Sequence, residues 1–171
     1  MKNIVLVGFM GTGKTVIAKA LSGELERKYV SIDHLIEERE GRSISSIFAE
    51  SGEEYFRKVE KEMVKEVSRR AGQVVDTGGG VVLDDENMEN LKRSGIVICL
   101  WSDPRTIWER TKAHSHRPLL EVEDPLKRIE VLLEHRRPFY EKADFHVDTA
   151  KEDIPSAVER IKEIVHGEKK R

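Results

Sequence analysis

Cysteine is almost absent from the sequence, because only Cys99 occurs among its 171 residues. No disulfide can therefore form within the chain, as is usual for proteins of a reducing compartment. Cys99 lies inside the apolar run at 96–101. A thiol in such a run is inert, so we expect it to pack in the core rather than take part in chemistry.

Long apolar runs are also lacking. No stretch reaches the ~18 residues that suggest a membrane-spanning helix, and the N-terminal run at 4–7 is too short for a signal peptide. Charge of one sign is not in excess, because 30 Lys and Arg stand against 32 Asp and Glu, for a net charge of −2. A basic field that would attract nucleic acid is thus missing. We expect a cytoplasmic monomer with neither nucleic acid nor membrane as partner.

Repeats, low-complexity linkers and domain breaks are missing as well, which favours a single domain over residues 1–171. Short apolar runs alternate with longer amphipathic stretches, and this alternation predicts a parallel sheet with helices on both faces. The predicted strands are 4–7, 29–32, 73–76, 96–101 and 145–148. The predicted helices are 14–25, 53–72, 104–113, 124–143 and 154–165, with a short one after Asp33. In such a fold the ligand site lies at the carboxyl ends of the strands.

What the sequence does contain is a glycine-rich turn, Gly8-Phe9-Met10-Gly11-Thr12-Gly13-Lys14-Thr15, between the first strand and the first helix. It matches G-x-x-x-x-G-K-[ST], whose backbone N–H groups and following helix N-terminus hold the phosphates of a nucleoside triphosphate. We expect Lys14 to reach the β- and γ-phosphates and Thr15 to offer its hydroxyl to Mg²⁺.

Several protein classes share this turn. A GTPase would need Asn-Lys-x-Asp to recognise guanine, and the chain has none, although residues 76–79 fit the common Asp-x-x-Gly pattern. A motor ATPase would usually be longer. The polar segment 112–125 contains two prolines and lies between two predicted helices, as a lid would. A kinase for a small acceptor is therefore favoured.

Polar residues elsewhere suggest where that acceptor binds. Asp33 follows the second strand, where a carboxylate can accept or orient a hydroxyl proton, although it could equally cap the next helix. Three glycines at 78–80 allow close backbone approach. Arg57 and Arg136 could bind a carboxylate through bidentate hydrogen bonds. From the residues alone, Arg57 is rather a helix-surface residue that pairs with Glu53, Glu54 or Glu60.

Together these elements resemble shikimate kinase. The resemblance rests on "GFMGTGKT", "IDHLIEEREGRSISSIFAESGEEYFRKVE", "TGGG", "RPLL" and "RRPFYEKAD", and covers residues 3 to about 165. It implies transfer of the γ-phosphoryl group of ATP to the 3-hydroxyl group of shikimate, with Mg²⁺ as cofactor. It also implies a five-stranded parallel sheet in the order 2-3-1-4-5 within a three-layer α/β domain. A mobile lid would span about 112–125 and an acceptor-binding region about 33–61.

The resemblance also implies a role for each candidate site residue. The nucleotide would be bound by Gly11, Thr12, Gly13, Lys14, Thr15, Val16, Arg110, Arg117 and Pro155, with Arg110 stacked on adenine. Shikimate would be bound by Asp33, Arg57, Gly78, Gly79, Gly80 and Arg136, with Glu60 holding Arg57. The catalytic residues would be Lys14, Asp33 as base or orienter, and Arg117 as the lid residue that stabilises the transition state.

The chain departs from the family pattern at one place. The family usually has Asp-x-Asp at the end of the second strand, whereas this chain has Ser31-Ile32-Asp33. The carboxylate that commonly helps to hold Mg²⁺ is thus replaced by a hydroxyl group. Asp76, at the end of the third strand, could supply it or could simply cap that strand. His114 and His116 lack an evident third ligand, so we expect no metal site there.

Two alternatives remain open from the residues alone. A kinase for another polyol or sugar acid, such as gluconate, would share the phosphate-binding turn and the lid. It would not call for the segment beginning at Gly41-Arg42-Ser43 together with Arg57 and the three glycines. A nucleotide-binding switch without catalysis would not need two arginines in an acceptor pocket.

Overall fold

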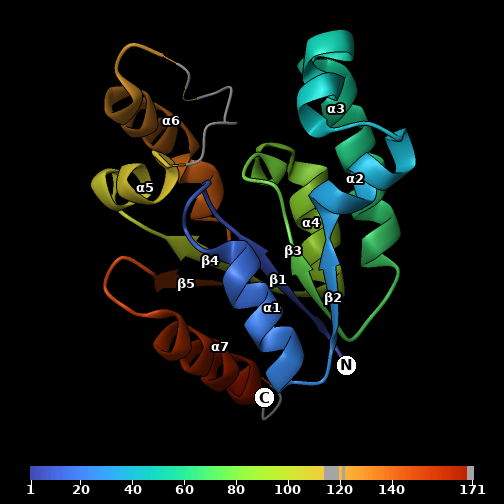
Figure 1. Cartoon of the computed structure of the whole chain (residues 1–171). Helices are drawn as coiled ribbons and strands as arrows, with labels where there is room; N and C mark the ends of the chain where they lie inside the picture. The colour runs from blue at the N-terminus through green and yellow to red at the C-terminus, as the bar shows by residue number, and fades with distance from the viewer. Residues whose placement is uncertain (114–119, 121, 169–171) are drawn as a thin grey trace.

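Five parallel strands form the central layer of the structure, a computed structural model that describes residues 1–113, 120 and 122–168 (Figure 1). The strands are β1 (Asn3–Val7), β2 (Lys28–Ser31), β3 (Gln73–Asp76), β4 (Gly95–Trp101) and β5 (Phe145–Asp148). Their order is β2-β3-β1-β4-β5, which confirms the predicted topology. Because every pair is parallel, the carboxyl ends of all five strands lie along one edge of the sheet.

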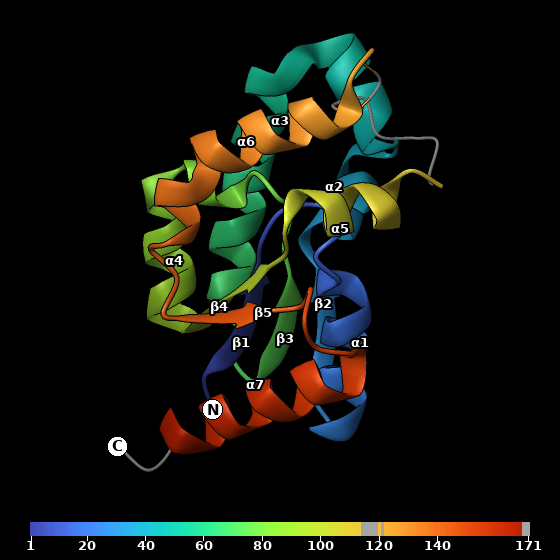
Figure 2. The same cartoon turned by 90° about the vertical axis from the view of Figure 1, so that its left-hand side faces the viewer.

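Helices cover both faces of this sheet (Figure 2). In the described part of the chain they are α1 (Lys14–Glu24), α2 (Ile32–Glu40), α3 (Ile44–Ser68), α4 (Asp85–Ser94), α5 (Pro104–Thr111), α6 (Pro125–Tyr140) and α7 (Ile154–Glu168), with a 3₁₀ turn η1 (Val81–Leu83). None of these helices is both long enough and apolar enough to span a membrane.

Strand β1 shows how the sequence builds the three layers. All five of its residues are buried, as expected for a central strand covered on both faces. Ile4 and Leu6 belong to the core formed with α1 and α7. Val5 and Val7 belong to the core on the opposite face, to which α2 to α6 contribute. Because β1 is the middle strand, the phosphate-binding turn that follows it lies at the centre of the row of strand carboxyl ends.

The predicted strands agree with the structure to within one residue at each end. Ile32 was predicted in the second strand but begins α2, because the side-chain oxygen of Ser31 accepts a hydrogen bond from His34 N at 3.2 Å and caps the helix. The prediction that Asp33 could be this cap is therefore wrong. Its carboxylate lies in the first turn of α2 instead.

Helix α3 is longer than predicted and bends in the middle. Gly52 has non-helical angles (φ 81°, ψ 170°) that separate an unpredicted first segment from the predicted second one. The helix ends at Ser68 rather than at Gly72, which lies in the turn before β3. The bend makes Glu53 the first residue of the second segment, one turn before Arg57.

Candidate active site

The turn between β1 and α1 has the backbone geometry of a phosphate-binding loop. Gly11 (φ 76°) and Gly13 (φ 92°) lie in the left-handed region that favours glycine. A Cβ on Gly11 would also lie 2.8 Å from Thr111 Cγ2 of α5. Gly13 caps α1, so the N-terminus of this helix opens into the loop, where it favours an anion.

The polar side chains of the loop are held by its own backbone. Lys14 Nζ donates hydrogen bonds to Gly8 O (2.8 Å) and Phe9 O (2.9 Å). Thr12 Oγ1 donates to Phe9 O at 2.7 Å. Val16, the apolar residue predicted to contact the nucleotide, makes no such bond and is half exposed on the first turn of α1. In this structure the Lys14 ammonium group is thus held against the carbonyl groups of its own loop.

Arg110 ties this loop to the segment after β5. Its Nη1 donates to Gly11 O (3.2 Å) and its Nη2 to Thr149 O (2.6 Å). Thr149 Oγ1 in turn donates to Thr12 O at 2.8 Å. Pro155 lies exposed in the first turn of α7. The sequence analysis missed Thr149, whose position just after β5 at the carboxyl edge of the sheet was the signal that could have found it.

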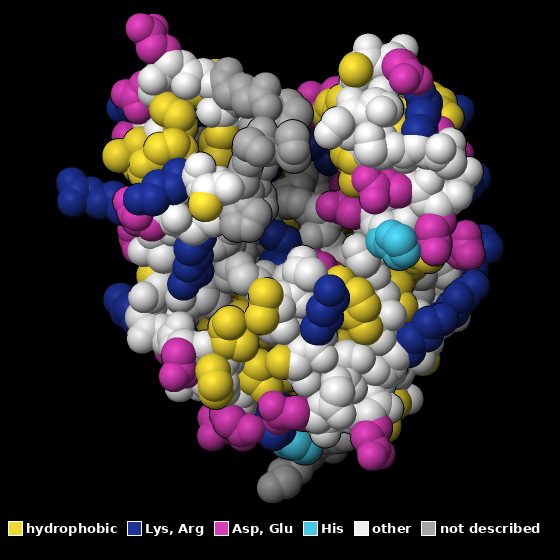
Figure 3. Space-filling model, in the orientation of Figure 1, with side chains coloured by type: hydrophobic (Ala, Val, Ile, Leu, Met, Phe, Trp, Pro, Cys, Tyr) yellow, Lys and Arg dark blue, Asp and Glu magenta, His cyan; other side chains and the backbone are white. Residues whose placement is uncertain are grey.

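A cleft of about 550 Å³ opens at this edge and is lined by residues of the loop, of α2 and of the end of β3. Among them are Lys14, Thr15, Asp33, Asp76 and Gly79. Figure 3 shows the surface hollowed between the part of the molecule that contains α5 and α6 and the part that contains α2 and α3. The candidate residues from distant parts of the sequence therefore share one concave site.

Two carboxylate oxygens converge on Gly78 in this site. A Cβ on Gly78 would lie 2.9 Å from Asp33 Oδ1 and 3.2 Å from Glu60 Oε1. Both oxygens are buried and have no hydrogen-bond partner among the described residues. Burial raises the pKa of both carboxyl groups, against the opposing effect of Lys14 on Asp33 and of Arg57 on Glu60. Unpaired buried acceptors are costly, so these oxygens suit a ligand that brings hydroxyl donors.

Arg57 lies against Gly80, the third glycine of the same turn. A Cβ on Gly80 would clash with Arg57 Nη2. Nη1 donates to Glu60 Oε2 at 2.8 Å, as predicted for a glutamate that holds this arginine. Nε and Nη2 donate to Glu53 Oε1 at 3.3 and 3.2 Å. The alternative expectation of a helix-surface ion pair is thus also met, on the other edge of the guanidinium group.

Arg136 reaches the same turn from α6. Its side chain is buried, its Nη1 lies 3.5 Å from Gly79 O, and its guanidinium group lies 5.6 Å from the centre of the Phe9 ring. Tyr140 fixes the turn by donating from its hydroxyl group to Gly79 O at 2.7 Å. The two arginines predicted to bind one carboxylate therefore meet at one turn, although Phe9 and Tyr140 were not predicted.

Asp76 ends β3 beside the phosphate-binding loop. Its Oδ2 accepts hydrogen bonds from Thr15 Oγ1 (2.7 Å) and from the Tyr29 hydroxyl group (3.1 Å). Burial and the nearby Asp76 raise the pKa of Tyr29 to about 12, so Tyr29 stays neutral and can donate. The described residues contain no group of three or more His, Cys, Asp or Glu side chains that would hold a metal ion alone.

Some candidates cannot be placed. Arg117 lies outside the described residues, as do His114 and His116. Half of the segment 112–125, at 114–119 and 121, is likewise outside them.

Comparison with known proteins decides the family. A family model described as shikimate kinase matches residues 10–166. The chain belongs to the shikimate kinase family. The shikimate kinase of Thermodesulfovibrio yellowstonii is 51% identical over 149 residues, which cover 87% of this chain and 86% of that protein. The shikimate kinase of Caldanaerobacter subterraneus subsp. tengcongensis is 45% identical over 161 residues, 94% of each chain.

Solved structures agree. Shikimate kinase from Acinetobacter baumannii in complex with shikimate superposes with a TM-score of 0.94 at 34% sequence identity. The superposition covers 100% of this chain and 96% of that one. Shikimate kinase from Bacteroides thetaiotaomicron has a TM-score of 0.89 at 33% identity, with 96% and 98% coverage. The resemblance seen in the motifs is confirmed, and membership of this family makes the chain an ATP-dependent kinase.

Proposed function

We propose that the cleft transfers the γ-phosphoryl group of ATP to the 3-hydroxyl group of shikimate and yields shikimate 3-phosphate and ADP, in the biosynthesis of chorismate and the aromatic amino acids. One observation carries this proposal. The turn at 78–80 gathers two arginines and two carboxylates directly beside the phosphate-binding loop, since a Cβ on Gly79 would lie 3.4 Å from Gly8 O. A receptor for a hydroxylated acid is thus built against a receptor for phosphates.

The acceptor half of the cleft suits a small ring acid. Arg57 and Arg136 would bind its carboxylate, because a guanidinium group matches a carboxylate with two parallel hydrogen bonds. The unpaired oxygens of Asp33 and Glu60 would accept hydrogen bonds from its hydroxyl groups. Asp33 would orient the reacting hydroxyl or take its proton. Gly78, Gly79 and Gly80 would let the acceptor approach the backbone.

The nucleotide half follows from the loop. The backbone N–H groups of Gly11, Thr12 and Gly13 would hold the phosphates at the start of α1, and Lys14 would move from the loop carbonyls to the β- and γ-phosphates. Adenine would lie near Val16, between Arg110 and Pro155. Arg117 would stabilise the charge of the transferring group, a role proposed from the family motif alone.

A magnesium ion fits this donor set. Thr15 offers a hydroxyl at the start of α1 and Asp76 a carboxylate 2.7 Å from it. Mg²⁺ is commonly held by one or two such groups together with water and the phosphates of the substrate. When bound, it would neutralise charge on the β- and γ-phosphates. The protein's own part is to hold Thr15, Lys14 and the acceptor hydroxyl in one geometry.

That positioning is where most of the catalysis would come from. Phosphoryl transfer needs little covalent chemistry from the protein. Holding two reactants in line can remove about 7–11 kcal/mol of the barrier. The described cleft supports such alignment because Lys14, Asp33, Gly78 and Gly79 line it together.

The test is acceptor-dependent formation of ADP in a coupled assay, with shikimate, gluconate or no acceptor. We expect turnover only with shikimate. Equal turnover with gluconate would favour a kinase of another sugar acid. Tight binding of nucleotide without turnover on either acceptor would favour a switch protein, and either result would overturn the proposal.

We also propose that the chain acts as a cytoplasmic monomer whose partners are its small-molecule substrates, without nucleic acid or membrane. The balanced charge and the single buried thiol support this view. Sedimentation equilibrium should give a mass near 19.6 kDa, and a dimer mass would contradict it.

A further inference from the structure

The carboxylate beside Thr15 belongs to Asp76 at the end of β3. The usual family pattern would place such a carboxylate at the end of β2 instead. Ser31 ends β2 and Asp76 ends β3, and the two residues are paired in register across these parallel strands. Both line the same cleft. Neighbouring strands lie only about 4.8 Å apart. A carboxylate at either position would therefore reach nearly the same place.

Ser31 has another role. Its hydroxyl oxygen caps α2 by accepting from His34 N, and its side chain carries no charge. Asp76 instead directs Oδ2 toward Thr15 Oγ1. In this chain the hydroxyl group therefore lies at the end of β2 and the carboxylate at the end of β3.

The hydrogen-bond donors fix how these groups are arranged. An ionised carboxylate can only accept, so Thr15 must donate its single hydroxyl proton to Asp76. The lone pairs of Thr15 Oγ1 are then free to face away from Asp76, as a ligand to Mg²⁺ requires. Tyr29 must also donate to the same Oδ2, because it is neutral. Two hydroxyl groups from different elements thus hold one carboxylate oxygen.

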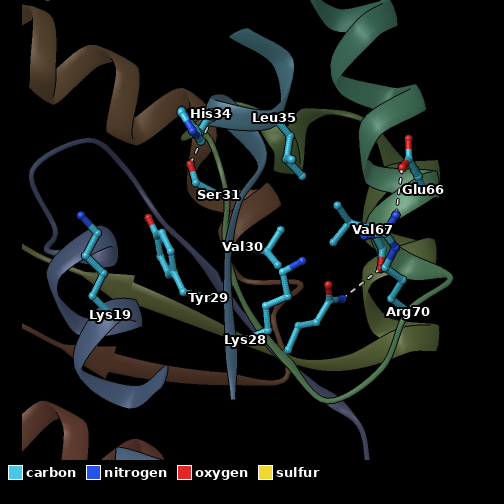
Figure 4. Close-up of a pocket in the computed structure, with 11 residues that line it drawn as sticks. Lys19, Lys28, Tyr29, Val30, Ser31, His34, Leu35, Glu66, Val67 and Arg70 are labelled. Carbon is cyan, nitrogen blue, oxygen red and sulfur yellow. Dashed lines mark hydrogen bonds and ion pairs between the residues drawn. The ribbon is translucent and has the colours of Figure 1, made fainter. Parts of the chain in front are cut away.

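Tyr29 is suited to this by its place on β2. It precedes Ser31 by two residues, so both side chains lie on the same face of the strand. Figure 4 shows Tyr29 on the α1 side of β2, next to Lys19 and across the strand from Val30 and Leu35. Lys19 Nζ lies 5.6 Å from the centre of the Tyr29 ring. The ring is therefore supported between α1 and β2, with its hydroxyl group directed to Asp76.

We propose that Asp76 replaces a carboxylate at position 31 as the group that orients Thr15 toward Mg²⁺, and that Tyr29 is a positioning residue that fixes Asp76. The inference rests on the proposed function in one respect, the use of a magnesium–nucleotide complex. It does not depend on the identity of the acceptor.

The experiment measures metal binding without turnover. Mn²⁺ is titrated into the full chain with ADP present and followed by electron paramagnetic resonance. Groups that orient a metal ligand typically contribute 10- to 100-fold to affinity, so Asp76→Ser should weaken Mn²⁺ binding by about that factor. The exchange variant Ser31→Asp/Asp76→Ser should recover most of the loss. Asp is as good a helix cap as Ser, so the exchange should leave α2 intact.

Tyr29 is tested in two backgrounds, the natural chain and Asp76→Ser. Tyr29→Phe should weaken Mn²⁺ binding by about 10-fold in the natural chain, but not in Asp76→Ser, where no carboxylate remains at position 31 or 76 for Tyr29 to hold. Tyr55→Phe is the matched control, since it also removes a phenol hydroxyl that donates to a carboxylate, Glu40 Oε2 at 3.0 Å, away from the cleft. It should leave Mn²⁺ affinity unchanged.

Several outcomes would overturn the inference. Asp76→Ser could bind Mn²⁺ as tightly as the natural chain, or the exchange variant could fold, judged by circular dichroism, without recovering affinity. An equal loss from Tyr29→Phe in both backgrounds would reduce Tyr29 to a packing role. Expected Mn²⁺ results without shikimate-dependent ADP formation would reject the proposed function alone, and the reverse pattern would reject this inference alone.

Discussion

Asp33 is the residue in which function and stability are most directly opposed. Burial raises the pKa of its carboxyl group. A carboxyl with a folded pKa above its unfolded value stabilises the fold only below the unfolded pKa, and that contribution is lost as the pH rises through the folded pKa. The ionised form of Asp33 is therefore less favourable for the fold of the free protein than the protonated form.

Replacing this charge should stabilise the chain and inactivate it. We expect Asp33→Asn to lose turnover and to raise the free energy of unfolding at pH 7 by about 1 kcal/mol, because a neutral amide of the same shape replaces a poorly solvated carboxylate whose Oδ1 has no hydrogen-bond partner among the described residues. Urea unfolding at two pH values measures this. The gain should shrink in acid, where the natural Asp33 is protonated too. A less stable variant at pH 7 would contradict the argument.

Glu53 competes with the acceptor for Arg57. Its Oε1 occupies the Nε and Nη2 edge of the guanidinium group, and that edge is suited to bidentate binding of a carboxylate. Glu53→Gln should lower the KM for shikimate about twofold to fivefold, the range expected for an exposed ion pair. Steady-state kinetics with varied shikimate measures this. The exposed neighbour Glu54→Gln is the control for charge alone, and an equal effect there would refute direct competition.

At the scale of elements, a charge network joins α3 to α4. Lys61 Nζ lies 3.0 Å from Asp84 Oδ2 and 2.8 Å from Glu86 Oε2, and Lys65 Nζ lies 2.6 Å from Glu86 Oε1. Hydrogen bonds from the two lysines lower the pKa of Glu86 to about 2. Its contribution is present above the ordinary pKa of glutamate and is lost as the pH falls toward about 2.

Glu86→Gln tests this network. The variant should melt at a lower temperature than the natural chain at neutral pH, by an amount that shrinks as the pH falls through that window. Thermal unfolding followed by circular dichroism, at several pH values, measures the difference. Because the groups are exposed, high salt should also reduce it. A difference independent of both pH and salt would point to packing instead.

Some elements could be predicted from the sequence and others could not. The central strands β1, β3 and β4 were found because each is a short, largely apolar run that is buried on both faces of the sheet. The edge strands β2 and β5 are only partly buried and were found as short runs between amphipathic stretches. Helix α4 was missed because only Met88 and Leu91 supply its buried apolar surface, too little to give a periodic signal. The first segment of α3 was missed because Gly52 interrupts the pattern.

The site residues also divide into those that the sequence predicted and those that it did not. The loop, Asp33, Arg57, Arg136 and the glycines were found because they belong to contiguous motifs. Their convergence was expected from the strand carboxyl ends and from the family resemblance together. Tyr29 and Thr149 were not found, because their contacts join residues 47 and 137 positions apart. No local pattern records such a contact.

For the whole molecule, Cys99 is a built-in probe of unfolding. It is fully buried in β4, between β1 and β5, and burial raises the pKa of its thiol to about 12. Labelling by a thiol reagent should therefore require the sheet to open. We expect the labelling rate to follow the unfolded fraction across a urea series, and ADP to slow it, since a ligand of the folded state stabilises that state. Rapid labelling of the native protein in the absence of urea would show local opening of β4 instead.

The lateral pairing of Ser31 with Asp76 bears on how such proteins diverge. Alignment compares residues along the chain, so an acidic group that has moved sideways to the adjoining strand is scored as two unrelated changes. In space, the charge of Asp76 would lie at nearly the same place beside Thr15. Where a motif residue is missing in a parallel-sheet enzyme, the place to look is its register partner.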